Sequence, residues 1–288
     1  MGAYGVGLVL NPDIARFLRE RPGEVDYVAV IPETLWADSR SGADRFRSSP
    51  AATAMLDEVA STLPLVAHGI GLSIGTAADL DVPHLDQVAS WQERYGFAWY
   101  GEHLSYTRVV SSTGTQRHAG LALPVPYDAD VLEAVAARVA GVRERVPVPF
   151  ALENPVTFTP LADEDMTEPE FLNALAARSG CHVLLDLHNL HVNAVNGVAD
   201  AEAYVAALDL ANVIEIHVAG GKTLSGTYTD AHSGPCPDEV WRLLDAVLPR
   251  CPNVRGVTFE IVAGHYDRLG QDTIAAEVAR MRAAWERR

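Results

Sequence analysis

The stretch GCHVLLDLHNLHVNA, residues 180–194, indicates the fold most clearly. Its apolar run ends in Asp186, and a near-continuous apolar run of this length is typical of a parallel strand covered on both faces. Gly180 stands where the helical pattern before it, residues 168–179, requires a left-handed C-cap. We therefore predict a helix, then a buried strand over residues 182–187 with a polar side chain near its C-terminal end.

The same alternation extends over the whole chain. Thr167 and Glu170 form a predicted capping box at the start of one helix. The predicted strands cover residues 4–10, 25–32, 63–68, 97–103, 148–154, 182–187, 213–218 and 257–262, and the helices cover 12–20, 49–63, 84–95, 128–146, 168–179, 200–210, 238–248 and 272–287. Eight strands, each followed by a helix, predict an α/β fold: a (β/α)8 TIM barrel in one domain, residues 1–288. An open doubly wound sheet is the alternative, because strand order is not visible in a sequence.

Composition limits the classes of function. The 288 residues suit a barrel, which usually takes about 250. With 22 Lys and Arg against 38 Asp and Glu, the net charge of −16 argues against a nucleic-acid partner. No apolar run approaches the roughly 18 residues of a membrane span, so we expect no membrane association and a cytoplasmic location. Cys181, Cys236 and Cys251 have no regular spacing, which argues for a reducing compartment and against a disulfide framework.

Candidate metal ligands follow six consecutive predicted strands. Active sites of TIM barrels lie at the C-terminal ends of the strands. A single His or Asp there often caps the next helix, but many imidazoles and carboxylates at one mouth would repel or stay unsatisfied without cations. We therefore predict a metal centre. Its candidate ligands are His68, His103, Glu153, Asp186, Asn189, His217, Asp230, His232 and Glu260.

The donor types narrow the choice of metal. None of the candidates is a cysteine, so a thiolate zinc or iron–sulfur site is disfavoured. Imidazole mixed with carboxylate suits Fe, Mn, Zn or Co, and nine ligands exceed the roughly six that one ion takes. Two or three ions are expected. A divalent-metal-dependent sugar isomerase or hydrolase on a xylose-isomerase-like barrel could use a similar set, as could a metal-storage barrel without activity.

The other histidines have plainer expected roles. His188 and His191 flank Asn189 and are expected to support ligands or the loop rather than bind metal. His84 and His118 are expected at the surface. His182 begins a strand and therefore lies at the opposite end of the barrel.

Two further features lie near the predicted mouth. Glu102 should point to the face opposite His103 and pair with a helix, whereas Glu33 could line the mouth. The glycine-rich run HGIGLSIG, residues 68–75, does not have the spacing of a phosphate-binding loop. We expect its glycines to allow close approach of the backbone to the metal centre.

Several motifs together resemble one family. In chain order they are HGIGLSIG (68–75), GEHL (101–104), LPVPY (123–127), ALENP (151–155), LLDLHNLHVNA (184–194), EIHVAGG (215–221), DAHSGPCPDEVW (230–241) and Glu260. They resemble the multinuclear non-heme iron-dependent oxidative enzymes, also known as the domain of unknown function 692 family. The resemblance runs from about Gly5 to the last helix.

The resemblance implies a TIM barrel with two or three iron ions (Fe2+/Fe3+) and dioxygen as co-substrate. It implies oxidative modification of a ribosomally made precursor peptide, at a cysteine or an Asp or Asn side chain, and a partner protein that binds the leader peptide. The nine candidates above would all bind metal, and Asp230, His232 and Glu260 would also be catalytic. This chain departs from the pattern at Val262, where many relatives have Asp, at Gly221, where His is frequent, and in the His188–Asn189–Leu190–His191 stretch.

Overall fold

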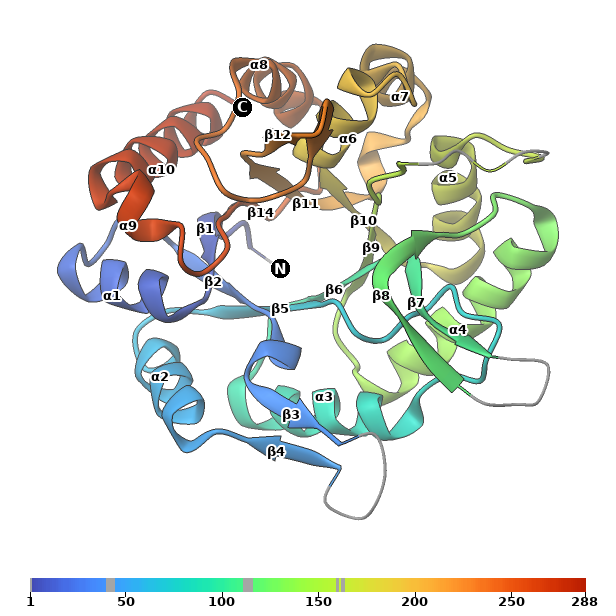
Figure 1. Cartoon of the computed structure of the whole chain (residues 1–288), viewed down its shortest axis with the longest axis horizontal. Helices are drawn as coiled ribbons and strands as arrows, with labels where there is room; N and C mark the ends of the chain where they lie inside the picture. Colours follow the sequence, from blue (N-terminus) through green and yellow to red (C-terminus); the bar gives the residue numbers. More distant parts are fainter. Residues whose placement is uncertain (1, 40–44, 111–115, 159–160, 162–163) are drawn as a thin grey trace.

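The chain folds as a closed barrel of eight parallel strands in a computed structural model that describes residues 2–39, 45–110, 116–158, 161 and 164–288 (Figure 1). Strand β1 pairs with both β2 and β14, which closes the ring. The TIM-barrel prediction is confirmed, and the open-sheet alternative is wrong. The barrel strands are β1 (Gly5–Val9), β2 (Tyr27–Val30), β5 (Leu65–Gly69), β6 (Tyr100–His103), β9 (Phe150–Glu153), β10 (His182–Asp186), β11 (Val213–Ala219) and β14 (Gly256–Glu260).

Helices form the outer ring of the barrel (Figure 1). The predicted capping box between Thr167 and Glu170 is present, and Gly180 adopts the left-handed conformation with φ of 68°. These two caps explain why the predicted helix over residues 168–179 has the observed bounds. The outer helices are α1 (Pro12–Glu20), α2 (Pro50–Ala60), α3 (Val82–Tyr95), α4 (Ala129–Arg145), α5 (Glu168–Ser179), α7 (Ala201–Ala207), α8 (Asp238–Val247) and α10 (Gln271–Glu286).

Most of the short elements that the sequence did not predict lie in the loops that follow barrel strands. Three antiparallel hairpins follow β2, β6 and β11, and helix α6 begins directly after β10. The hairpins are β3 (Trp36–Asp38) with β4 (Phe46–Ser48), β7 (Ser105–Val110) with β8 (Gln116–Pro124), and β12 (Lys222–Leu224) with β13 (Thr227–Thr229). The remaining elements are α6 (Leu187–Val195), α9 (Tyr266–Leu269) and the 3-10 turns Pro32–Thr34, Leu210–Asn212 and Leu248–Arg250. The hairpins, α6, α9 and the Pro32–Thr34 turn build up the C-terminal face of the barrel, whereas the other two turns precede β11 and β14 at the opposite end.

The barrel interior is filled below this face. Tyr27, Trp99 and Leu184 belong to a cluster of buried residues inside the ring. Glu215 enters the same space and accepts hydrogen bonds from Trp99 Nε1 at 2.6 Å and from Thr258 Oγ1 at 2.7 Å. The interior is therefore a packed core, which leaves the C-terminal mouth as the place for a site.

Within the described part of the chain, no helix has the length and apolar character needed to cross a membrane. All three cysteines are free and buried.

Candidate metal centre

The structure brings all nine predicted ligands to one mouth. His68, His103, Glu153, Asp186, His217 and Glu260 lie at the C-terminal ends of six barrel strands, Asn189 lies in the first turn of α6, and Asp230 and His232 lie between β13 and α8. Most are almost inaccessible to solvent, whereas His103, Asp230 and His232 are partly exposed. The parallel strands cause this convergence, because all their carboxyl ends face the same way.

Two buried carboxylates connect the imidazoles. Glu153 Oε2 lies 3.5 Å from Nε2 of both His68 and His103. Glu260 Oε1 lies 2.6 Å from His217 Nδ1, and its Oε2 lies 3.0 Å from His232 Nδ1. Each carboxylate thus faces two imidazoles, a combination of donors that suits first-row metal ions.

The start of α6 positions two further oxygens. Asp186 is the N-cap of this helix, and its Oδ1 accepts a hydrogen bond from the Asn189 backbone N–H at 2.7 Å. The Asn189 amide donates to Glu153 Oε1 at 3.0 Å and to the Asn154 carbonyl at 3.1 Å. Both amide hydrogens are thereby used, so the Asn189 Oδ1 and the second Asp186 oxygen remain available to a cation.

Buried polar atoms that form no hydrogen bond indicate whether these residues could hold metal ions. Across the described residues, eight buried side-chain atoms of this group form no hydrogen bond of normal geometry, although some, such as His217 Nδ1 and Glu260 Oε1, lie within ion-pair distance of each other. They are His68 Nδ1, Glu153 Oε2, Asp186 Oδ2, Asn189 Oδ1, Glu260 Oε1, both ring nitrogens of His217, and His232 Nε2. Native proteins seldom leave such atoms unpaired, since each costs about 1–3 kcal/mol. Cations at this mouth would satisfy them, so the donor set fits a metal centre.

The backbone also carries strain here. His232 has φ of 43°, in the left-handed region that non-glycine residues rarely adopt. Such conformations cost about 1–3 kcal/mol and cluster at functional sites.

Burial and neighbouring charges shift the pKa values of the buried His and Glu side chains at the mouth. Burial, and then the charge of Asp186, raises the pKa of Glu153 well above its usual range. Burial alone would lower the pKa of His217 and raise that of Glu260, but each lies opposite the other, so the pKa of His217 is raised and that of Glu260 is lowered. Burial, together with the neighbouring imidazoles of His217 and His103, lowers the pKa of His68 well below its usual range, although the Glu260 carboxylate opposes this shift. A metal ion binds neutral imidazoles and ionised carboxylates, so its binding here would displace the protons that these raised pKa values retain on His217 and Glu153.

Among the described residues, the candidate ligand atoms fall into four groups, each spanning at most 4.8 Å. Three of them share His68, Glu153 or His217, and the fourth consists of His188, Asp230 and His232. The arrangement therefore offers more than one position for an ion.

Two buried residues beside the centre were not among the predicted ligands. His188 was expected to support other residues, yet it is fully buried with Nδ1 2.9 Å from Asp230 Oδ1. Glu215 lies with its Oε1 3.2 Å from His217 Nε2. The period of two along β11 could have revealed Glu215, because it shares the inward face with His217.

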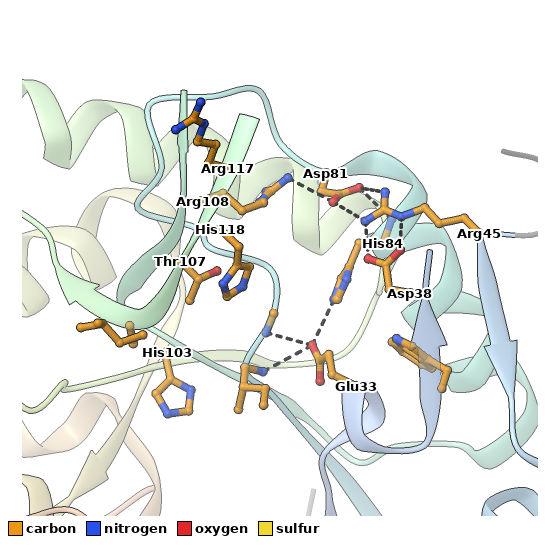
Figure 2. Close-up of a pocket in the computed structure, with 15 residues that line it drawn as sticks. Glu33, Asp38, Arg45, Asp81, His84, His103, Thr107, Arg108, Arg117 and His118 are labelled. Atoms are coloured by element: carbon orange, nitrogen blue, oxygen red, sulfur yellow. Dashed lines mark hydrogen bonds and ion pairs between the residues drawn. The ribbon is translucent and has the colours of Figure 1, made fainter. Parts of the chain in front are cut away.

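A cavity of about 620 Å3 adjoins the metal centre on the side of His103, and Figure 2 shows its lining. Glu33 and His84 form a pair in it, 3.1 Å apart. His84 is therefore buried, and the expectation that it lies at the surface is wrong. The rings of Trp36 and Phe46, from the β3–β4 hairpin, cover it. The sequence could not show this cover because the hairpin was not predicted.

Arginines hold the far wall of this cavity. Arg45 binds Asp38 and Asp81 through paired contacts of 2.7–2.8 Å, and Arg108 binds Asp81 at 3.1 Å (Figure 2). His118 is exposed at the rim, as expected.

The glycine-rich loop after β5 contacts the carboxylates of Glu33 and Glu102. A Cβ at Gly69 would lie 2.3 Å from Glu102 Oε2, and one at Gly71 would lie 2.9 Å from the Glu33 side chain. The backbone N–H groups of Gly71 and Leu72 donate to Glu33 and Glu102. The glycines therefore make room for buried carboxylates rather than for the metal centre itself, and Glu102 pairs with this loop rather than with a helix.

A second cavity, of about 590 Å3, adjoins the centre on the side of His232 and Glu260. Its walls are mainly apolar and include Ile31, Met55 and Ile261. Val262 also lines it and is 49% exposed. The mouth thus opens to a polar cavity on one side and an apolar one on the other.

Comparison with solved structures supports the fold alone. A D-psicose 3-epimerase of Clostridium cellulolyticum H10, solved with D-tagatose, superposes with a TM-score of 0.60 at 11% identity, covering 98% of this chain and 99% of the epimerase. An IolI protein with a bound zinc atom gives 0.55 at 14% identity, covering 96% and 95%.

Sequence relatives are closer. A UPF0276 protein of Caulobacter vibrioides is 32% identical over 98% of this chain and 94% of its own length. Another UPF0276 protein, of Chromobacterium violaceum, is 36% identical over 76% of this chain and 77% of its own length. The family model described as "RiPP precursor modification enzyme MbnB/TglH/ChrH" matches residues 5–284, where RiPP denotes a ribosomally synthesised and post-translationally modified peptide. The family resemblance of the motifs is thereby confirmed, and the chain belongs to this family of RiPP precursor modification enzymes.

Proposed function

We propose that this protein is an iron-dependent oxidase that uses dioxygen to modify a cysteine, or an Asp or Asn side chain, in a ribosomally made precursor peptide. The observation that carries the proposal is the convergence of nine N and O ligands, several of them unsatisfied, at one barrel mouth. Membership in a family that modifies such precursors supports the peptide substrate. A leader-peptide-binding partner protein is part of the same proposal.

The donor set is compatible with iron, as it is with Mn, Zn or Co, and the resemblance to the non-heme iron enzymes is the reason for proposing iron. The set combines imidazoles with carboxylates and contains no thiolate, which suits a redox-active first-row metal. Two or three iron ions would be held by His68, His103, Glu153, Asp186, Asn189, His217, Asp230, His232 and Glu260. When bound, iron supplies electrons to dioxygen and an open coordination position.

The protein's own residues supply the surroundings for this chemistry. Asn189 orients Glu153 by donating one amide hydrogen to it, and the Gly69 carbonyl lies 3.2 Å from His103 Nδ1, which fixes that ring. Asp230 and His232 lie on a loop and are partly exposed, so we assign them, with Glu260, to the side that the substrate reaches. The two cavities would accept the peptide on either side of its modified residue.

The decisive experiment is a mass measurement on a precursor peptide. The protein is co-expressed with a small peptide encoded beside it and with any neighbouring leader-binding protein. We expect a mass change that requires both iron and dioxygen, and fragment spectra will show whether a cysteine or an Asp or Asn side chain carries it. The same mass change under anaerobic conditions would contradict the oxidase and favour a metal-dependent hydrolase or isomerase.

Variants give this test its control. Glu153→Ala should abolish both iron binding and the mass change, because its carboxylate faces two imidazoles of the centre. His182→Ala, at the opposite end of the barrel, should retain both. An anaerobically prepared protein that binds at most one zinc ion and no iron would contradict the multinuclear centre.

A further inference from the structure

We infer that His188 is a metal ligand and that, with Asp230 and His232, it forms a separate metal position at the outer edge of the mouth. This inference rests on the metal centre proposed above and adds a ligand to it. The three side chains come from different elements, since His188 lies in α6 and the others lie in the loop after β13. Their donor atoms lie within 4.8 Å of one another.

The distances are those of ligands around one ion. Asp230 Oδ1 lies 2.9 Å from His188 Nδ1 and 2.7 Å from His232 Nε2. Two adjacent ligands that each lie about 2.1 Å from a metal are about 3 Å apart. The spacing of this carboxylate oxygen and the two imidazole nitrogens is therefore compatible with three ligands of one metal ion.

The other ring nitrogen of His188, Nε2, has a hydrogen-bond partner. Its Nε2 lies 3.4 Å from the Tyr228 hydroxyl, whose oxygen also accepts the Gly221 backbone N–H at 3.1 Å. Ligating histidines commonly donate their second N–H to such a fixed oxygen, which sets the tautomer and aims the first nitrogen at the metal. Tyr228 is thus a positioning residue for His188.

The chain also makes room for this imidazole. A Cβ at Gly221 would lie 3.0 Å from His188 Nε2 and 2.1 Å from the Thr229 carbonyl oxygen. A larger residue at position 221 would therefore compete with the ring for the same space. His188 is completely buried in this position, so its polar ring needs a specific partner.

The alternative role for His188 is a hydrogen bond that merely supports Asp230, and His188→Asn separates the two. Asparagine can still donate to Asp230 from nearly the same place but is a much weaker metal ligand. Purified full-length protein is titrated anaerobically with Fe2+, and bound metal is measured by equilibrium dialysis and elemental analysis. Circular dichroism and thermal melting of the metal-free variants verify folding.

We expect His188→Asn to lose one equivalent of bound iron, or to bind it at least tenfold more weakly, with the other equivalents unchanged. Tyr228→Phe, which removes only the hydroxyl, should weaken the same equivalent by about tenfold. The matched control is His191→Asn, three residues further along α6 and outside the ligand group, which should retain the full stoichiometry.

Equal stoichiometry and affinities within threefold in His188→Asn and the unchanged protein would overturn the inference. That result leaves the oxidase proposal intact, because the other ligands would still bind iron. Conversely, loss of one equivalent without any oxidation of a peptide would support His188 as a ligand while contradicting the proposed function.

Discussion

The Nδ1 atom of His217 lies 2.6 Å from the Oε1 atom of Glu260, on two adjacent barrel strands. Burial opposes both charges, but each group holds the other in its charged form, so that the pKa of His217 is raised and that of Glu260 is lowered. In the metal-free protein a proton therefore stands where we propose a metal ion.

The first prediction concerns proton release. Because His217 and His232 both have raised pKa values, metal binding at neutral pH should displace protons, and affinity should increase as the pH rises. Calorimetry in buffers with different ionisation enthalpies measures the number released. Glu260→Gln should release fewer protons for each ion that still binds. An equal number in both proteins would show that Glu260 does not hold these protons.

The second prediction is that Glu153→Gln stabilises the metal-free protein while it weakens metal binding. The folded-state pKa of Glu153 is raised, so the stability that its neutral form contributes is present below about pH 4.5 and is lost as the pH rises through the folded pKa. Glutamine stays neutral and can still accept the hydrogen bond from Asn189. We expect a gain of about 1–3 kcal/mol that increases with pH, measured by urea unfolding. A metal-free variant less stable than the unchanged protein at pH 8 would contradict this.

The third prediction concerns Glu215, whose Oε1 lies 3.2 Å from His217 Nε2 on the side of the barrel interior. Glu215→Ala leaves the buried Trp99 and Thr258 donors unpaired and should cost about 3 kcal/mol or more of unfolding free energy. Glu215→Gln keeps an acceptor for Trp99, so it should fold well but bind metal about 10–100-fold more weakly. Metal titration and urea unfolding of both variants check this. Unchanged metal affinity in Glu215→Gln would mean that His217 needs no support from this side.

The fourth prediction compares two arginine pairs. Arg45 is 17% exposed and ties the β3–β4 hairpin to Asp81 at the start of α3, so Arg45→Met should destabilise the protein by about 2–4 kcal/mol. Arg94→Met is the matched control, since its pair with Asp57 is about half exposed and should contribute less than about 1 kcal/mol. Thermal and urea unfolding measure both. Equal losses would show that the hairpin is not held through Arg45.

The fifth prediction is a pH dependence far from the metal centre. Burial raises the pKa of Glu168, at the start of α5, to about 7, and the Tyr204 hydroxyl donates to it at 2.8 Å. The neutral form is favoured in the folded state, so its stabilisation is complete below about pH 4.5 and declines by up to about 3 kcal/mol as the pH rises to 7. Glu168→Gln should lack this decline, and the difference between the two unfolding profiles isolates it. Parallel profiles between pH 5 and 7 would contradict the prediction.

The sequence by itself indicated eight strands alternating with helices, whereas closure of the barrel through β1 and β14 is a tertiary contact. Apolar runs separated by amphipathic helices place the barrel strands and outer helices to within a few residues. Caps such as Thr167 and Gly180 mark helix ends closely, since these signals are local. The nine candidate ligand positions followed from the same pattern, because parallel strands bring their carboxyl ends together whichever residues lie between them. The motifs were enough to indicate the family.

Only the tertiary structure decided what surrounds those strand ends. The hairpins after β2, β6 and β11 are too short to give a periodic signal, so the burial of His84 was not visible in the sequence. The place of His188 depends on the absence of a side chain at Gly221, which lies on a different loop. Contacts between distant loops depend on three-dimensional packing rather than on local pattern. They therefore decide which residues surround the proposed outer metal position and what shapes the two neighbouring cavities have.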